Sequence, residues 1–214
     1  MKKYKMKLKF LFKEAKNFIR QLSKKQQLIH FNKSTQNNIN SFDVGLQSIV
    51  GHHIDISKGT YISQDSVVES YTFIGFNSLI SKTKIGRYNS IASNVNIGHG
   101  EHPIENISTN ILFIKNPYET LIAKDCIIEN DVWIGVGVTI RRGVTIGTGS
   151  IIGANSFVNK DVPPYSIVVG SPSRLIKYRF SPQKIEVLLK SKWWEFDYDE
   201  AQILLNELEI NTAE

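Results

Sequence analysis

The side chains best suited to chemistry in this sequence are its five histidines, two of which stand in one short segment. His99 and His102 flank Gly100 and Glu101, and Glu105 follows soon after. An imidazole titrates near neutral pH, so it can take a proton from a weakly acidic hydroxyl group. The segment therefore predicts general-base chemistry, with the two carboxylates as candidates for orienting the imidazole or a substrate.

Other catalytic chemistry has little support in the sequence. The single cysteine, Cys126, stands in an apolar run, which predicts a buried thiol and excludes an intramolecular disulfide. No Gly-x-Ser-x-Gly motif marks a nucleophilic serine. His52 and His53 do not combine with the other histidines into a metal-ligand spacing, so we expect no metal site. These observations favour direct transfer between two bound substrates over a covalent intermediate.

A six-residue repeat must position these histidines. Isoleucine occurs 29 times, against 14 leucines and 14 valines, and this excess of a β-branched residue favours strands. Apolar residues recur at every sixth position, with one slip and one long interruption, at Val44, Val50, Ile56, Ile62, Val68, Ile74, Ile80, Ile85, Ile91, Ile97, Ile128, Ile134, Ile140, Ile146, Ile152 and Val158. Small residues follow many of them. Such a period predicts stacked β-coils that bury one continuous apolar column.

Three segments depart from the repeat and divide the chain. We expect residues 1–40 to form a basic amphipathic helix over about 7–22 and an Asn/Ser-rich linker over 32–41. Residues 41–171 form the repeat domain, from which residues 99–127 leave as a loop excursion. Residues 172–214 form a C-terminal helical segment in which Ser181 and Pro182 begin a helix.

The charge is concentrated at the N-terminus. Residues 1–40 carry eleven Lys and Arg against one acid, whereas the rest carries fifteen against nineteen. A cationic amphipathic helix can lie on an anionic membrane, so peripheral membrane contact through residues 1–30 is one interpretation. Packing on the solenoid or on another subunit is the other. No aromatic-basic pattern predicts nucleic-acid binding. The absence of a signal sequence or an apolar span predicts a cytoplasmic protein, with the inner face of the membrane as the alternative location.

Three further motifs carry a family resemblance from Val44 to Trp194. They are Gly98-His99-Gly100-Glu101-His102-Pro103 with Ser108-Thr109, Asp131-Val132-Trp133-Ile134-Gly135, and Asn159-Lys160-Asp161-Val162-Pro163-Pro164-Tyr165 with Gly170-Ser171-Pro172-Ser173-Arg174. With the hexads, they make the sequence resemble the hexapeptide-repeat acyltransferases, in particular the xenobiotic and surface-polysaccharide O-acetyltransferase branch. The resemblance implies a mainly β fold, a left-handed parallel β-helix with three hexads per triangular coil, assembled as a homotrimer.

The resemblance also implies roles for individual residues. His102 matches the catalytic histidine, and His99 becomes a neighbour that contacts substrate. Acetyl-coenzyme A is expected along a groove between adjacent subunits, with no metal. Its contacts are expected at Trp133 beside the pantetheine arm, at the turn of Gly153 and Ala154, and at Lys160 and Arg174 near the nucleotide phosphates. We expect the backbone N–H of Gly135 to stabilise the oxyanion.

Taken together, the sequence predicts an acetyl-CoA-dependent O-acetyltransferase that acts on a sugar hydroxyl, for example in a bacterial surface polysaccharide. The alternatives are acetylation of an antibiotic hydroxyl and N-acetylation of an amino sugar, which would use the same base and groove. A non-catalytic β-solenoid scaffold would explain the hexads equally well, but it would leave the motif residues unexplained.

Overall fold

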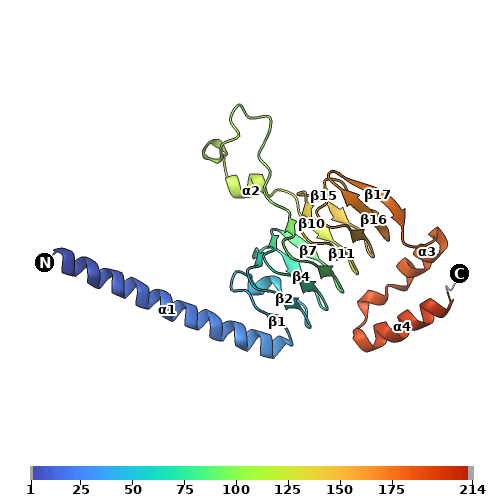
Figure 1. The fold of residues 1–214 in the computed structure, drawn as a ribbon, viewed down its shortest axis with the longest axis horizontal. Helices are drawn as coiled ribbons and strands as arrows, with labels where there is room; N and C mark the ends of the chain where they lie inside the picture. The colour runs from blue at the N-terminus through green and yellow to red at the C-terminus, as the bar shows by residue number, and fades with distance from the viewer. Residues whose placement is uncertain (1, 212–214) are drawn as a thin grey trace.

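The computed structural model describes the backbone of residues 2–211 and the side chains from residue 12 onward. The body is a parallel β-solenoid of about seven turns (Figure 1), built from three sheets. The eight-stranded sheet contains β1 (Asn38–Ile39), β2 (Asp55–Ile56), β5 (Phe73–Ile74), β8 (Ser90–Ile91), β11 (Trp133–Ile134), β14 (Ile151–Ile152), β16 (Ser166–Gly170) and β17 (Ser173–Tyr178). The predicted parallel β-helix is therefore confirmed.

The other two sheets complete each coil. The five-stranded sheet contains β3 (Tyr61–Ile62), β6 (Leu79–Ile80), β9 (Asn96–Ile97), β12 (Thr139–Ile140) and β15 (Phe157–Val158). The four-stranded sheet contains β4 (Val67–Val68), β7 (Thr83–Ile85), β10 (Cys126–Ile128) and β13 (Thr145–Ile146). Parallel pairing aligns hexad with hexad, as Ile56 with Ile74 and Ile74 with Ile91.

The apolar column and the hydroxyl groups at the corners hold the coils together. Ile56, Ile74 and Ile91 are fully buried, because one side chain of each two-residue strand must point into the solenoid. At the corners, buried hydroxyls reach the next coil: Thr60 Oγ1 donates to the Gly75 carbonyl at 2.7 Å, and Ser48 Oγ to that of Ser63 at 2.8 Å. These bonds satisfy polar groups that burial would otherwise leave unpaired.

One hexad position is wrong. Val50 is 62% exposed, and Ile49 takes the inward place at 8% exposure and bridges to Val68. The cause is the short 3₁₀ helix Leu46–Ser48, which shifts the chain by one residue before the regular coils begin.

The N-terminal helix is longer than expected. α1 spans Lys2–Thr35, so most of the predicted linker over 32–41 is the end of this helix and strand β1. Asn32 explains the junction: its side chain donates to the Ile39 carbonyl at 2.9 Å and accepts from the Ile39 N–H at 3.0 Å. Leu8 and Leu11, expected on the apolar face, lie outside the described side chains.

The C-terminal segment is not helical throughout. It begins with β17, which pairs antiparallel with β16. α3 (Pro182–Ser191) follows, and the Ser181 side chain accepts from the Lys184 N–H as the predicted N-cap. A 3₁₀ helix (Trp193–Glu195) and α4 (Tyr198–Asn211) complete the segment. Arg87 anchors it to the solenoid through a 2.7 Å bond to Asp197.

Candidate active site

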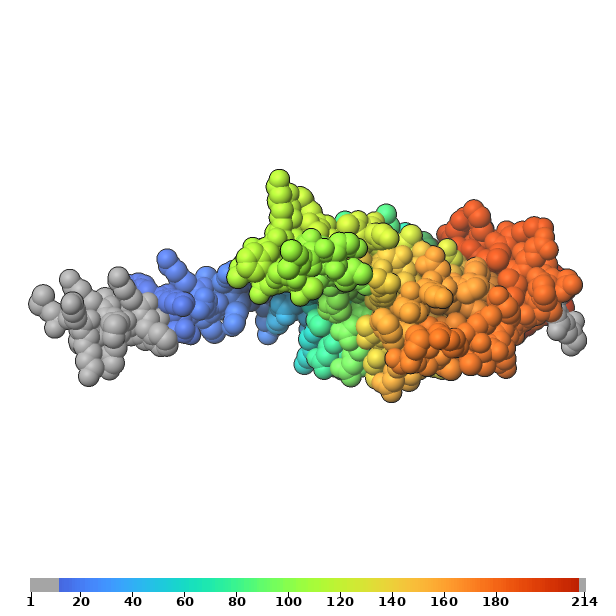
Figure 2. Space-filling model, turned by 90° about the horizontal axis from the view of Figure 1, so that it is seen from above, coloured from blue at the N-terminus to red at the C-terminus, as the bar shows by residue number. Residues whose placement is uncertain are grey.

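The loop excursion, predicted over residues 99–127, spans residues 98–125 in the structure, because β9 ends at Ile97 and β10 begins at Cys126. It carries the 3₁₀ helix Ile111–Phe113 and α2 (Pro117–Leu121), and it stands out from the body in Figures 1 and 2. Its side chains Ile104, Ile107, Leu112 and Phe113 are each at least 73% exposed. Large exposed apolar groups of this kind are typical of interaction surfaces.

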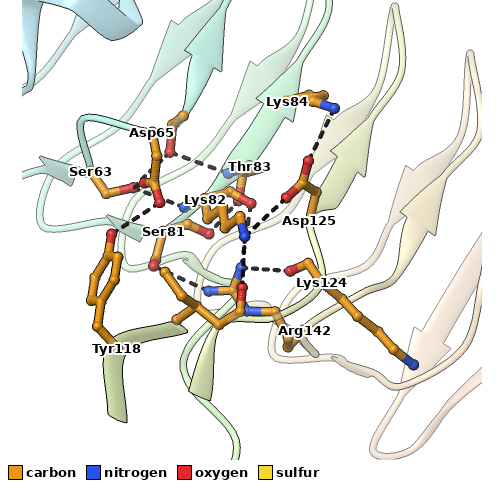
Figure 3. Close-up of polar contacts among 12 residues, drawn as sticks. Ser63, Asp65, Ser81, Lys82, Thr83, Lys84, Tyr118, Lys124, Asp125 and Arg142 are labelled. Carbon is orange, nitrogen blue, oxygen red and sulfur yellow. Dashed lines mark hydrogen bonds and ion pairs between the residues drawn. The ribbon is translucent and has the colours of Figure 1, made fainter. Parts of the chain in front are cut away.

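The base of the loop excursion is fixed by a buried arginine (Figure 3). Arg142 is 7% exposed, and its guanidinium donates to the Lys124 carbonyl at 2.9 Å and to Ser81 Oγ at 3.1 Å. Lys82 Nζ donates to the Ile122 carbonyl at 3.1 Å. Asp125 forms ion pairs with Lys82 at 3.7 Å and with Lys84 at 3.0 Å. The returning strand of the loop therefore has little freedom where it meets the solenoid.

A second contact holds α2 against the solenoid. Tyr118 OH donates to Asp65 Oδ2 at 2.9 Å, and Ser63 Oγ donates to Asp65 Oδ1 at 2.5 Å (Figure 3). Partial burial favours a raised pKa for Asp65, but the hydrogen bonds from Ser63 and Tyr118 outweigh it and lower the pKa. The ionised carboxylate thus links α2 to the turn after β3.

α2 in turn supports the histidine segment. The Glu101 N–H donates to the Leu121 carbonyl at 2.9 Å. A Cβ on Gly100 would lie 3.0 Å from Leu121 Cβ, so the glycine lets the two strands of the loop approach. His102 follows directly, and its position depends on this contact.

His102 is exposed and has one oriented ring nitrogen. Its Nδ1 lies 2.6 Å from the carbonyl oxygen of Thr109. A carbonyl can only accept, so Nδ1 carries the proton and Nε2 of the neutral ring is an unprotonated acceptor. His99 differs, because its Nε2 lies 3.3 Å from the side-chain oxygen of Asn96. Of the two histidines, only His102 is held by a backbone group with Nε2 left open.

Glu101 does not orient the imidazole. Its two oxygens accept from Arg141 at 2.6 and 2.9 Å, a bidentate pair. The hydrogen bond from Arg141 lowers the pKa of Glu101. Arg141 gives no signal in the sequence beyond ending a hexad, so its role was missed.

His102 opens into a groove of about 850 Å³ between the loop excursion and the corner of the solenoid. Glu105, Lys124, Arg141 and Lys160 also line it. Of the candidate residues, the groove therefore brings Lys160 together with His102, Glu101 and Glu105. The cations Lys124, Arg141 and Arg142 were not expected there.

The other candidate residues lie elsewhere on the chain. Trp133 is 56% exposed on β11, which belongs to the eight-stranded sheet, whereas His102 follows the five-stranded sheet. Gly153 and Ala154 follow β14, the strand next to β11. Arg174 lies on β17, and its guanidinium donates to the Ser173 carbonyl at 3.0 Å. None of these four residues lines the His102 groove.

The expected oxyanion donor is not available. The Gly135 N–H donates to the Ile152 carbonyl at 2.8 Å within the ladder between coils. A Cβ at this position would lie 2.6 Å from the Ala154 nitrogen, so close packing of the coils accounts for the glycine. In this structure the Gly135 N–H is engaged in the ladder, and the absence of a side chain allows the two coils to approach.

Across residues 2–211, no group of three or more His, Cys, Asp or Glu side chains is arranged to hold a metal ion. Within the same part of the chain, no helix is long and apolar enough to cross a membrane.

The repeat geometry agrees with a family comparison. Residues 125–160 match the model of the family described as bacterial transferase hexapeptide (six repeats). The similarity to this family is therefore confined to about a sixth of the chain. The matched residues run from the end of the loop excursion through β15, which is the part of the solenoid that contains Trp133 and Lys160.

The chain is similar to curated proteins over part of its length. It is 44% identical over 90 residues to a probable macrolide acetyltransferase of Lysinibacillus sphaericus, which covers 42% of this chain and 48% of the relative. It is 47% identical over 77 residues to a chloramphenicol acetyltransferase of Morganella morganii, which covers 36% and 37%. These matches span about half the length of the relatives, or less.

Solved structures share the fold of this chain. A point mutant of AntD, an N-acyltransferase from Bacillus cereus in complex with dTDP-4-amino-4,6-dideoxyglucose and coenzyme A, has a TM-score of 0.57 at 24% identity over 72% of this chain and 85% of that chain. PerB from Caulobacter crescentus, in complex with CoA and GDP-perosamine, has a TM-score of 0.51 at 19% identity over 66% and 57%. At these identities the likeness shows the fold alone.

Proposed function

We propose that this protein transfers an acetyl group from acetyl-CoA to a hydroxyl group, with His102 as the general base. The observation that carries the proposal is the 2.6 Å contact from His102 Nδ1 to the Thr109 carbonyl, which leaves Nε2 unprotonated beside an open groove. The named acetyltransferases among its relatives support the reaction class.

One histidine can carry out both proton transfers that the reaction requires. Nε2 of His102 takes the hydroxyl proton as the oxygen attacks the acetyl carbonyl carbon. Collapse of the tetrahedral intermediate breaks the carbon–sulfur bond and releases the thiolate of coenzyme A. The imidazolium then returns the proton to that sulfur, so ester and free thiol leave and the neutral histidine is restored.

The outer face of the eight-stranded sheet carries apolar side chains that could bind acetyl-CoA. Trp133 and Phe73 are exposed on the eight-stranded sheet, with Ser90 between them, and offer apolar walls for the pantetheine arm. Lys160 and Arg174 are cations suited to its phosphates. In this proposal, the turn at Gly153 and Ala154 lets the arm pass.

We propose a homotrimer in which each site forms between subunits. One chain separates Trp133 from the His102 groove, and the exposed Ile107 and Phe113 of the loop excursion need cover. A neighbouring subunit would bring its own Trp133 face to the His102 groove and would cover the exposed side chains of the loop excursion. Light scattering should then give a mass of three chains of 24.3 kDa each.

The acceptor we favour is a sugar hydroxyl of a surface polysaccharide, and the location we propose is the cytoplasm, where acetyl-CoA is available. Acetylation of an antibiotic hydroxyl is the second candidate, because the matched relatives are named for macrolides and chloramphenicol.

A thiol-release assay tests the proposal. Acetyl-CoA is offered with monosaccharides, polysaccharide fragments, chloramphenicol, a macrolide and amino sugars. Acceptor-dependent thiol release that His102→Ala reduces by roughly 10²–10⁴ supports the mechanism. Release unchanged in His102→Ala contradicts the role of this base. An absence of CoA binding in a folded protein favours a scaffold.

A further inference from the structure

α1 extends far beyond the solenoid, and only its C-terminal end contacts the body (Figure 1). Leu28 and Phe31 join the apolar core, and Asn32 holds β1. A helix of 34 residues is about 50 Å long. Its described side chains before Leu28 are all exposed. Nothing in one chain explains why this length of helix is kept.

The exposed part of α1 has an apolar stripe along one side. Phe12, Phe18, Ile19, Leu22 and Ile29 are 47–65% exposed. Their spacings of three, four and seven residues place them on one face of a helix. Two of them are phenylalanines, which cost the most to leave in water. This stripe is built to be covered.

The opposite side of α1 is cationic. Lys13, Lys16, Arg20 and Lys24 lie away from the stripe at helical spacing, and Glu14 is the one acid in α1. The sequence adds five lysines among residues 2–9. The rest of the protein carries more acids than bases, so the positive charge belongs to this helix.

The apolar stripe and the cationic face of α1 together indicate which kind of partner the helix binds. A nucleic acid would bind the cations but leave the phenylalanines in water. A bundle of α1 helices from several copies would cover the stripe, yet it would gather like charges with almost no acids to pair them. An anionic lipid surface takes both features, because the apolar face enters the acyl boundary and the cations meet the headgroups.

We propose that α1 binds the surface of an anionic membrane as an interfacial helix and holds the solenoid beside it. The helix lies in the plane of the interface and does not span it. Because the proposal concerns binding, it stands apart from the acetyl transfer proposed above and is tested without it.

Vesicle flotation of the full-length protein tests this proposal. One set of vesicles contains phosphatidylglycerol and phosphatidylcholine, and the other contains phosphatidylcholine alone. We expect binding to the anionic vesicles only, and a loss of binding as salt is raised, because exposed charges are screened. Equal binding to both sets, or binding to neither, would overturn the proposal.

Matched variants separate the two components. Lys13→Gln/Lys16→Gln should weaken binding to anionic vesicles roughly tenfold or more. Lys58→Gln/Lys177→Gln removes the same charge from the solenoid and should bind like the wild type. Phe18→Gln/Leu22→Gln, which keeps helix propensity, should also lose binding. Equal losses in the solenoid control would overturn the assignment to α1.

Light scattering without vesicles identifies the competing partner. We expect all these variants to keep the mass of the wild type, with unchanged circular dichroism. If Phe18→Gln/Leu22→Gln lowers the mass instead, α1 is an interface between copies and the proposal fails. Binding to a DNA duplex that survives this variant, without vesicle binding, would overturn it in favour of a nucleic acid.

Discussion

In the loop excursion, His102 Nδ1 lies 2.6 Å from the carbonyl oxygen of Thr109. Because the acceptor is a backbone group, no side-chain substitution at Thr109 removes it, and the loop conformation itself sets the tautomer. The backbone thus does what a carboxylate does in a catalytic triad: it fixes which nitrogen is free. Glu101, the nearest carboxylate in sequence, is instead paired with Arg141.

The two histidines of the loop should separate clearly in kinetics. We expect His102→Ala to lower kcat by roughly 10²–10⁴, since a general base is lost. His99→Ala should keep kcat within a fewfold, because among the described residues His99 is hydrogen-bonded to Asn96 alone. Thiol release under saturating acetyl-CoA measures both. Comparable losses in the two variants would contradict the assignment of the base to His102.

Tyr118 should act as a positioning residue. Tyr118→Phe removes the bond to Asp65 that holds α2, and α2 supports the backbone beside His102. We expect kcat to fall by up to about 100-fold through misplacement of the base, with KM for acetyl-CoA unchanged. Tyr61→Phe, an exposed phenol on the adjacent strand β3, is the control. Wild-type kcat in Tyr118→Phe would rule out this support.

The Glu101–Arg141 pair should give a pH-dependent contribution to stability. The hydrogen bond from Arg141 lowers the pKa of Glu101, so the folded state favours the ionised carboxylate. Its contribution is present above the unfolded pKa near 4.5 and is lost as pH falls through the lower folded pKa. Wild type should therefore exceed Glu101→Gln in Tm at pH 7 but not at pH 3.

Because both side chains are solvent-exposed, the difference in Tm should be small and should shrink in high salt. Thermal unfolding at both pH values and two salt concentrations measures it. A Tm difference that is the same at pH 3 and pH 7 would show that another interaction of Glu101 is responsible.

The repeat could be predicted from the sequence because one physical requirement recurs in every coil. Ile56, Ile74 and Ile91 all meet the same need to fill the inside of a two-residue strand. The prediction that Val50 points inward was wrong because the 3₁₀ helix Leu46–Ser48 before it shifts the register by one residue. A repeat period alone does not predict where such a shift occurs.

The site was less predictable for the same reason. Arg141 meets Glu101 from forty residues away, and the pairing depends on how the loop folds back. At Gly135, the small residue was visible, but its N–H bond to Ile152 belongs to the neighbouring coil. The sequence shows which residue types are present, but it does not show which distant residue each of them contacts.

The corrected register makes a stability prediction. Ile91→Ala opens a cavity at a fully buried position and should cost about 2–5 kcal/mol. Val50→Ala should change stability by no more than about 0.5 kcal/mol, because this side chain is largely exposed. Urea unfolding of both variants measures the difference. If Val50→Ala lowers the free energy of unfolding as much as Ile91→Ala does, Val50 points into the solenoid as first predicted and the corrected register is wrong.

Tyr165 should make the fold sensitive to alkali. Its hydroxyl is buried without a hydrogen-bond partner among the described residues, and burial raises its pKa to about 12. The folded state therefore favours the protonated phenol. Stability is fully present below the unfolded pKa near 10 and is lost as pH rises from about 10 to 12, by up to about 3 kcal/mol.

Tyr165→Phe should remove this dependence. At pH 8 the variant should be as stable as the wild type or slightly more so, because the substitution deletes an unpaired buried hydroxyl. At pH 11 it should be the more stable of the two. Urea unfolding at both pH values measures this, with the exposed Tyr178→Phe as control. If Tyr165→Phe loses stability in alkali as steeply as the wild type, the buried phenol is not the group that titrates.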